Sequence, residues 1–314
     1  MPTARFTIGL LILGLVACAP APKPAEGYIT VPGGRIYWAR MGDGPGTPLI
    51  VIHGGPGSTS FGLKPWAALG DERPVIRYDQ LGSGKSDHPT DTTLFTVDRA
   101  VRELQALRDS LGLDEVHLYG RSWGAMLVEA YMGGQPTGVH SVILSSPLVT
   151  TAQWERDADS LLTTLPDSVQ KVIAEQEAAG TTDSPEYQAA MTVYYDLYVR
   201  RQPRRSPADA DSAAATHGDL VYQYMWGPSE FTAMGTLKTF DATEWIKGLT
   251  VPTLFLAGEF DEATPASTEQ FSKLVPGAEF RVIPNSAHAS ENDNPDDLIR
   301  IVREFLNRVE GSRP

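Results

Sequence analysis

The sequence predicts an α/β fold: a mostly parallel sheet flanked by helices, with one helical insertion. Short apolar runs alternate with amphipathic segments up to about residue 147, which is typical of parallel βαβ units. Helical, polar and aromatic segments then dominate 148–247, and strand-like runs resume from 248. At 314 residues, the chain suits one domain better than two independent ones. We therefore expect a core formed by 27–147 and 248–314 and a helical cap formed by 148–247.

The core strands are expected where short runs are apolar or β-branched. Two β-rich runs around Pro32-Gly33-Gly34 predict a hairpin that opens the core. Mainly apolar runs predict the other strands of the core, and the fully apolar run 48–52 predicts a buried strand of the parallel type. These runs are 48–52, 74–78, 116–119, 141–145, 253–257 and 279–283.

Two helices have clear end signals. Apolar residues recur every three or four positions over 97–111, with Thr96 as the expected N-cap and Gly112 just past the end. The charged residues between them, Arg99, Glu103 and Arg108 included, are expected to form the other face. The last helix is expected to begin after Asn294 as N-cap.

The first residues predict export and lipid attachment. A short positive segment precedes an apolar run over 6–16, which is too short to span a bilayer. Leu15-Val16-Ala17-Cys18 then resembles a bacterial lipobox, and Cys18 is the only cysteine. We expect a signal peptide over 1–17, a lipid anchor on Cys18 and a tether over 18–26. The protein would face the periplasm in the cell envelope, with the outer membrane favoured because Ala19 follows the cysteine. The alternative is a plain secretory signal.

Composition excludes several other classes of protein. The net charge is −13 and no basic cluster is present, so nucleic acid is not an expected partner. No cluster of cysteine and histidine suggests a metal, and we expect neither a metal nor a cofactor. A single cysteine also leaves no disulfide within one chain.

The motif Gly120-Arg121-Ser122-Trp123-Gly124 lies between a predicted strand and a predicted helix. This context is that of a nucleophile elbow, in which a tight turn exposes a serine and both flanks must be small. Ser122 is the candidate nucleophile. A serine rather than an aspartate at this position argues against an epoxide- or halide-hydrolysing mechanism.

A serine nucleophile needs a base and a group that orients the base. In this strand–turn–helix arrangement the chain order is serine, acid, histidine. Asp261 and His288 both follow predicted strands, where ligand chemistry collects in open α/β sheets. Glu259 and Glu262 compete with Asp261 for the role of the acid. The other histidines lie in or before strands, in the insertion, or in loops before the serine.

The negative oxygen of the tetrahedral intermediate needs preorganised N–H donors. One expected donor is the N–H of Trp123, directly after the nucleophile. The other is expected from the loop His53-Gly54-Gly55-Pro56-Gly57, because glycine lets the backbone approach a substrate. Within that loop Gly55 is the predicted donor, and His53 is expected to support the loop by hydrogen bonding.

These motifs together resemble the α/β-hydrolase peptidases of the proline iminopeptidase family, which includes the aminopeptidases that act downstream of the tricorn protease. The resemblance runs from about residue 28 to the end and implies the α/β-hydrolase fold. The motifs that carry it are His53-Gly54-Gly55-Pro56-Gly57, Asp79-Gln80-Leu81-Gly82, the elbow, Gly258-Glu259-Phe260-Asp261 and His288.

The resemblance also implies a site for the substrate's free amine. Family members hold it with a glutamate in a Gly-Pro-x-Glu-Phe context and a glutamate beside the catalytic acid, which match Glu230 and Glu262. An ammonium leaving water needs such paired carboxylates. Leu81 stands where many proline-specific members have arginine, which leaves room for broader exopeptidase or amidase action.

The main hypothesis is a serine exopeptidase that releases N-terminal residues from short peptides or aminoacyl amides through an acyl-enzyme. The alternatives are an amino-acid amidase or small-molecule esterase of the same fold, and a non-catalytic binding lipoprotein. The aromatic runs Tyr194–Tyr198 and Tyr222–Trp226 are expected mostly to pack between cap helices.

Overall fold

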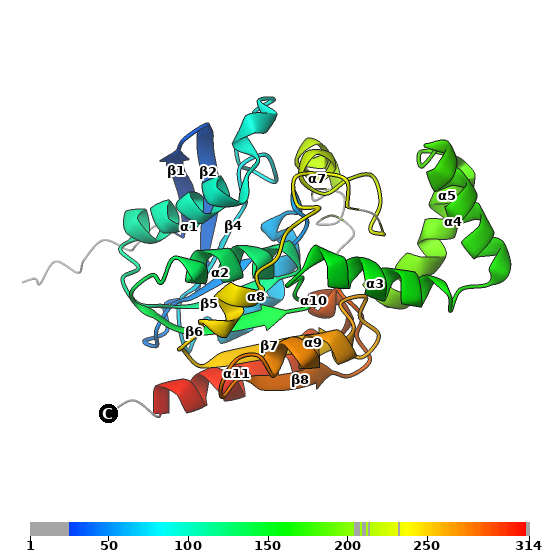
Figure 1. Cartoon of the computed structure of the whole chain (residues 1–314). Helices are drawn as coiled ribbons and strands as arrows, with labels where there is room; N and C mark the ends of the chain where they lie inside the picture. The colour runs from blue at the N-terminus through cyan, green and yellow to red at the C-terminus, as the bar shows by residue number, and fades with distance from the viewer. Residues whose placement is uncertain (1–24, 204–207, 209–211, 213, 232, 312–314) are drawn as a thin grey trace, which may run out of the picture.

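The computed structural model describes residues 25–311 apart from 204–207, 209–211, 213 and 232. Eight strands form one sheet in the order β1-β2-β4-β3-β5-β6-β7-β8 (Figure 1). The pairs β1–β2 and β2–β4 are antiparallel. The five other neighbouring pairs, from β4–β3 to β7–β8, are parallel. The predicted α/β fold with a mostly parallel sheet is therefore confirmed. The strands are β1 (Glu26–Val31), β2 (Gly34–Met41), β3 (Leu49–Ile52), β4 (Val75–Tyr78), β5 (Val116–Arg121), β6 (Val139–Ser145), β7 (Thr253–Gly258) and β8 (Glu279–Ile283).

Helices cover both faces of the sheet, and others form the insertion between β6 and β7 (Figure 1). Before the insertion come η1 (Ser60–Leu69), η2 (Thr92–Leu94), α1 (Val97–Leu111) and α2 (Trp123–Gly133). The insertion holds α3 (Thr151–Leu162), α4 (Asp167–Ala179), α5 (Pro185–Tyr194), η3 (Tyr195–Val199), α7 (Asp219–Met225) and α8 (Thr243–Lys247). After it come α9 (Pro265–Ser272), α10 (Ser290–Asp293) and α11 (Pro295–Gly311).

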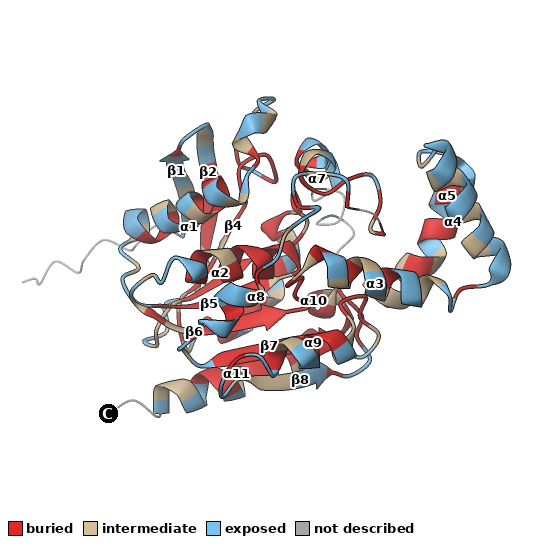
Figure 2. Ribbon diagram, viewed as in Figure 1, coloured by how far each residue is buried: buried red, intermediate tan, exposed pale blue. Residues whose placement is uncertain are grey.

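Alternate residues of the central strands belong to different apolar clusters. Ile50 and Ile52 of β3 pack with residues of α1, α2 and α8. Leu49 and Val51 pack with residues of η1 and α11 on the other face. All four are fully buried, and Figure 2 shows the central strands β5, β6 and β7 largely in red as well. Because both faces of the sheet are covered, the sequence of β3 is apolar throughout and does not alternate between apolar and polar residues.

The helix ends agree with the predicted signals. The hydroxyl of Thr96 accepts a 3.2 Å hydrogen bond from the N–H of Arg99, and Gly112 ends α1 in the left-handed conformation at φ 62°. Asn294 caps α11 in the same way, since its Oδ1 accepts from the N–H of Asp297 at 3.3 Å. These caps satisfy N–H groups that lack partners within their helices.

One expectation for α1 is wrong. Arg99, Glu103 and Arg108 are buried rather than exposed. The guanidinium of Arg99 pairs with Glu103, and Glu103 also accepts from the N–H of Leu81. The guanidinium of Arg108 donates to the hydroxyl of Tyr131 at 2.7 Å and to backbone carbonyls. Burial is tolerated because each charge has hydrogen-bonding partners, which the helical period cannot reveal.

The two ends of the insertion come together near the core. Thr150 and Asp241 form an isolated antiparallel bridge there. Beyond it, α3, α4 and α5 share an apolar cluster of their own, and α4 and α5 extend farthest from the sheet (Figure 1). α8 packs against α2 of the core. The division into a core of 27–147 and 248–314 and a cap of 148–247 stays a prediction, which the separate cluster supports. β1 begins at Glu26, inside the segment 18–26 predicted as a tether.

Candidate active site

The candidate residues follow the carboxyl ends of parallel strands. β5 ends directly before Ser122, β7 ends shortly before Asp261, and β8 ends shortly before His288. The loop that begins at His53 follows β3 in the same way. Because these strands are parallel neighbours in one sheet, their carboxyl ends meet along one edge, where α/β proteins bind ligands.

Ser122 occupies the strained turn expected of a nucleophile elbow. Its φ is 55° and its ψ is −124°, which is uncommon for a residue with a side chain. A Cβ on Gly120 would lie 2.2 Å from the carbonyl oxygen of Gly124, and a Cβ on Gly124 would lie 2.5 Å from the carbonyl oxygen of Ile52. The turn therefore requires glycine on both sides of the serine.

Asp261 and His288 are joined directly. Oδ1 of Asp261 lies 2.8 Å from Nδ1 of His288, and both residues are buried. The hydroxyl of Ser146 donates to Oδ2 of Asp261 at 2.5 Å, and the N–H groups of Gly258 and Ala263 donate at 3.0 and 2.9 Å. These bonds fix the carboxylate and direct the Nδ1–H of His288 toward it. The ring thereby keeps Nε2 for proton transfer.

Ser122 and His288 are not hydrogen-bonded to each other in this structure. Among the described residues, no hydrogen bond joins the serine hydroxyl to the imidazole ring. Nε2 of His288 instead lies 3.9 Å from Oε1 of Glu262. In enzymes without substrate this bond is often long and closes when the substrate binds.

The glycine-rich loop after β3 lies against the nucleophile. A Cβ on Gly54 would lie 3.1 Å from Cβ of Ser122, so only glycine allows this approach without a shift. Gly55 follows at φ 112°. Trp123 is the first residue of α2, so its N–H has no acceptor within the helix. Gly55 and Trp123 as donors to a substrate oxygen stay a prediction.

A series of buried hydrogen bonds joins this loop to the elbow. Nδ1 of His53 lies 2.8 Å from the carbonyl oxygen of Gly54, and Nε2 accepts from the N–H of Gln80 at 3.2 Å. The amide oxygen of Gln80 accepts from the indole N–H of Trp123 at 2.7 Å. His53 therefore has hydrogen bonds that support the loop, as expected from the sequence.

Glu230 and Glu262 lie near each other, and Glu262 lies beside the histidine. Oε1 of Glu230 accepts hydrogen bonds from the hydroxyls of Tyr222 at 2.8 Å and Tyr195 at 3.2 Å. Glu262 is 3% exposed, and within the described residues its Oε2 has no hydrogen-bond partner. Burial raises the pKa of Glu262 well above its usual range, and the negative charges of Glu230 and Asp261 raise it further. A positively charged group with N–H donors would stabilise both carboxylates.

Three supporting residues were not predicted from the sequence. Tyr195 and Tyr222 hold Glu230, whereas the aromatic runs that contain them were expected mostly to pack. Tyr194 does pack, with its ring centroid 4.7 Å from that of Phe231. Ser146 holds Asp261, and the only signal for it is its place directly after β6.

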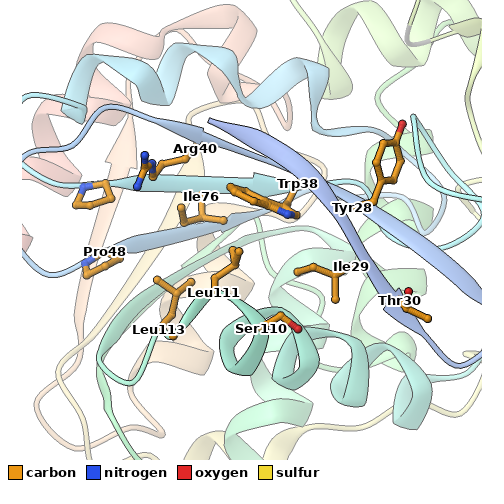
Figure 3. Close-up of a pocket in the computed structure, with 12 residues that line it drawn as sticks. Tyr28, Ile29, Thr30, Trp38, Arg40, Pro48, Ile76, Ser110, Leu111 and Leu113 are labelled. Atoms are coloured by element: carbon orange, nitrogen blue, oxygen red, sulfur yellow. The ribbon is translucent and has the colours of Figure 1, made fainter. Parts of the chain in front are cut away.

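A separate cavity of about 770 Å³ lies at the opposite ends of the strands. Its lining comes from β1, β2, β4, the residues that precede β3 and β4, and the end of α1 with the residues that follow it; Trp38, Ile76 and Leu111 lie at its centre (Figure 3). None of the described candidate residues lines it. The candidate site is therefore defined by its side chains and not by this cavity.

The sequence and the fold are similar to those of known proteins. A family model described as alpha/beta hydrolase fold matches residues 47–295, which makes the chain an α/β hydrolase. The chain is 45% identical over 285 residues to the proline iminopeptidase of Heyndrickxia coagulans, covering 90% of this chain and 99% of the relative. It is 35% identical to the enzyme of the same name from Lactobacillus delbrueckii subsp. lactis, covering 87% and 96%.

Two crystal structures share most of the fold. That of proline iminopeptidase from Mycobacterium smegmatis has a TM-score of 0.84 at 31% identity, covering 91% of this chain and 99% of the other. That of VinJ has a TM-score of 0.86 at 33% identity, covering 92% and 100%. The chain belongs to the proline iminopeptidase family. The predicted class of enzyme, a serine hydrolase that acts as an aminopeptidase, is confirmed.

The expectation of a lipid-anchored protein in the cell envelope is wrong. It depended on a short pattern at the start of the chain, whereas the match to proline iminopeptidases extends over 285 residues and gives no support for an anchor. The predicted signal peptide over 1–17 and the lipid attachment at Cys18 lie outside the described residues. Among the helices that the structure describes, none combines the length and apolar character needed to cross a membrane.

Proposed function

We propose that this protein releases N-terminal proline, or another small or hydrophobic residue, from short peptides and aminoacyl amides. Glu230 and Glu262 bind the free amine of the substrate. Ser122 attacks the first carbonyl carbon while His288 takes the hydroxyl proton through Nε2. Asp261 orients the ring and stabilises its positive charge.

The remaining steps use the same groups. The N–H groups of Gly55 and Trp123 donate to the oxygen that becomes negative in the tetrahedral intermediate. His288 then gives its proton to the leaving amine, and the acyl group remains on Ser122. Water, deprotonated by His288, attacks this ester and frees the amino acid.

The observation that carries the proposal is the acidic pair of Glu230 and Glu262, in which the buried Glu262 lies beside the base. Glu262 has a buried oxygen without a hydrogen-bond partner among the described residues, and Glu230 lies close enough to raise its pKa. Such a pair is unfavourable when empty and favourable around an ammonium group. The distance of 3.9 Å between Glu262 and His288 supports a bound amine close to the reacting carbonyl. This favours cleavage after the first residue.

The preference for proline is supported by the names of the relatives. The departure at Leu81 gives no structural reason against it. Leu81 is buried, and its side chain packs against the turn between β1 and β2, where a Cβ on Gly33 would lie 3.1 Å from it. The side chain of Leu81 is therefore packed within the fold, against the hairpin of β1 and β2.

The proposal is tested with fluorogenic amides of proline, alanine and leucine, each with a free and an acetylated amine. We expect hydrolysis of the free-amine substrates, with proline preferred, and a loss of at least about a hundredfold in kcat/KM on acetylation. Equal rates for free and acetylated substrates would overturn the proposed amine site and favour an esterase or a general amidase.

A further inference from the structure

Two consecutive acidic residues face the two nitrogens of one imidazole ring. Asp261 lies 2.8 Å from Nδ1 of His288, and Glu262 lies 3.9 Å from Nε2. Nε2 is the atom that must accept the proton of Ser122, yet no hydrogen bond joins it to that serine among the described residues. The free protein therefore has a carboxyl oxygen 3.9 Å from the nitrogen that the base must keep available to Ser122.

We propose that Glu262 is a positioning residue: in the free protein its carboxyl group competes with Ser122 for Nε2 of His288, and a substrate ammonium group removes this competition. The inference rests on the proposed function and extends it. Amine recognition then raises the turnover number as well as the affinity, because it makes the base available.

The surroundings of Glu262 favour a neutral carboxyl group before substrate binds. Its neighbours include the negative Glu230 and Asp261, the hydroxyl of Tyr194, and the guanidinium of Arg121. Burial and the two negative neighbours raise its pKa more than the hydroxyl of Tyr194 and the charge of Arg121 lower it. The protonated form of the carboxyl group is therefore favoured, and its Oε1 lies 3.9 Å from Nε2 of His288.

Binding of a substrate ammonium group favours the loss of one proton from Glu262. The ammonium brings a positive charge and N–H donors, so the ionised form of Glu262 becomes the favoured one. The carboxyl proton leaves to solvent, and a carboxylate–ammonium pair remains. His288 gains no proton in this step, and its Nε2 lone pair is then available to the hydroxyl of Ser122.

The test supplies the acyl group and the cation in separate molecules. A cyclopentanecarboxylate ester has the ring of a prolyl ester with carbon in place of nitrogen, so it leaves the amine site without a cation. Methylammonium chloride then supplies the cation, with potassium chloride at equal ionic strength as the control. In the wild-type protein we expect methylammonium to raise kcat for this ester by about fivefold or more.

Variants identify the residue that responds. Glu262→Ala removes the competing group, so kcat for the neutral ester is expected to be high without methylammonium and not to rise further. Glu262→Gln cannot ionise and is also expected to lose the activation, which keeps the test valid if the alanine variant does not fold. Glu259→Gln is the matched control: Glu259 is an exposed carboxylate on the same loop that accepts from the N–H of Asn285. It should retain the activation.

The outcomes are distinguishable from failure of the proposed function. If the wild-type protein cleaves prolyl amides but methylammonium does not raise kcat for the neutral ester, the inference fails and the proposed function stands. Retained activation in either Glu262 variant would also overturn the inference. If prolyl and acetyl-prolyl amides react equally, the proposed amine site itself fails.

Discussion

Tyr222 donates a 2.8 Å hydrogen bond to Oε1 of Glu230, and this bond links α7 of the insertion to the acidic pair beside the base. Tyr195 of η3 donates to the same oxygen at 3.2 Å. The proposed amine site therefore depends on two segments that are distant in sequence. Its geometry requires the insertion to fold over the sheet edge.

Replacing the hydroxyl that holds Glu230 should weaken binding of the substrate amine. Tyr222→Phe removes a hydrogen bond to a charged acceptor, which contributes about 1.5–3 kcal/mol. We expect KM for a prolyl amide to rise about tenfold or more. Tyr224→Phe on the same helix is the control, because no hydrogen bond joins Tyr224 to Glu230. Similar KM values for the two variants would contradict this role.

The close approach of Gly54 to the nucleophile gives a second prediction. Gly54→Ala places a methyl group 3.1 Å from Cβ of Ser122 and 3.3 Å from the carbonyl oxygen of Arg121. We expect the loop to shift and kcat to fall by about a hundredfold, since small misplacements at a reacting centre are costly. Gly62→Ala is the control, because its Cβ would meet nothing within 4 Å. A Gly54→Ala variant with wild-type kcat would show that the loop does not position substrate.

Glu129 on α2 should limit stability at high pH. It is fully buried, and neither carboxylate oxygen has a partner within the described part of the chain. Burial raises its pKa well above the usual value of 4.5. The folded form therefore retains a proton that the unfolded chain releases, and its contribution to stability is lost as the pH rises from about 4.5 through the folded pKa.

Glu129→Met should remove this dependence. We expect the free energy of unfolding to increase by about 1–3 kcal/mol at pH 8 and by less at pH 5. Urea unfolding at the two pH values measures the difference. An equal change at both would contradict the assignment to Glu129.

Glu310, near the end of α11, should contribute stability at neutral pH that is lost in acid. Its carboxylate pairs with both terminal nitrogens of buried Arg73, at 2.7 and 3.2 Å. Burial alone would raise the pKa of Glu310, but the hydrogen bonds and charge of Arg73 outweigh it and lower the pKa to about 2. The stability from this pair is present above pH 4.5 and lost as the pH falls toward 2.

Glu310→Gln should therefore destabilise the protein by about 1–3 kcal/mol at neutral pH, and by less in acid. Chemical denaturation at pH 7 and pH 3 measures both values. Lys171→Gln breaks an exposed pair with Glu175 and should cost less than about 0.5 kcal/mol. Equal losses for the two variants would show that the Arg73 pair contributes no more than a surface pair.

Much of the fold could be predicted from the sequence because its signals are local. The buried strands are short apolar runs, and the caps at Thr96 and Asn294 depend on residues close in the chain. Ser122, Asp261 and His288 each follow a predicted strand, and this placement predicted that they lie at the same edge of the sheet. Parallel pairing then brings these ends together without further information.

The residues that were missed depend on contacts between distant elements. Glu103 is paired with Arg99 and bonded to the backbone of Leu81, which the helical pattern cannot show. Tyr195 and Tyr222 bind Glu230 only because η3 and α7 fold over the same point. The contact of Glu262 with Nε2 of His288 depends on a loop conformation that the sequence leaves open.

The central claim is that Ser122 is the acyl acceptor for substrates with a free N-terminus. The most direct measurement is the release of proline from a prolyl amide by Ser122→Ala, with circular dichroism and thermal unfolding to verify the fold. We expect kcat to fall at least about a thousandfold with the fold intact. Hydrolysis near the wild-type rate by the folded variant would contradict the account.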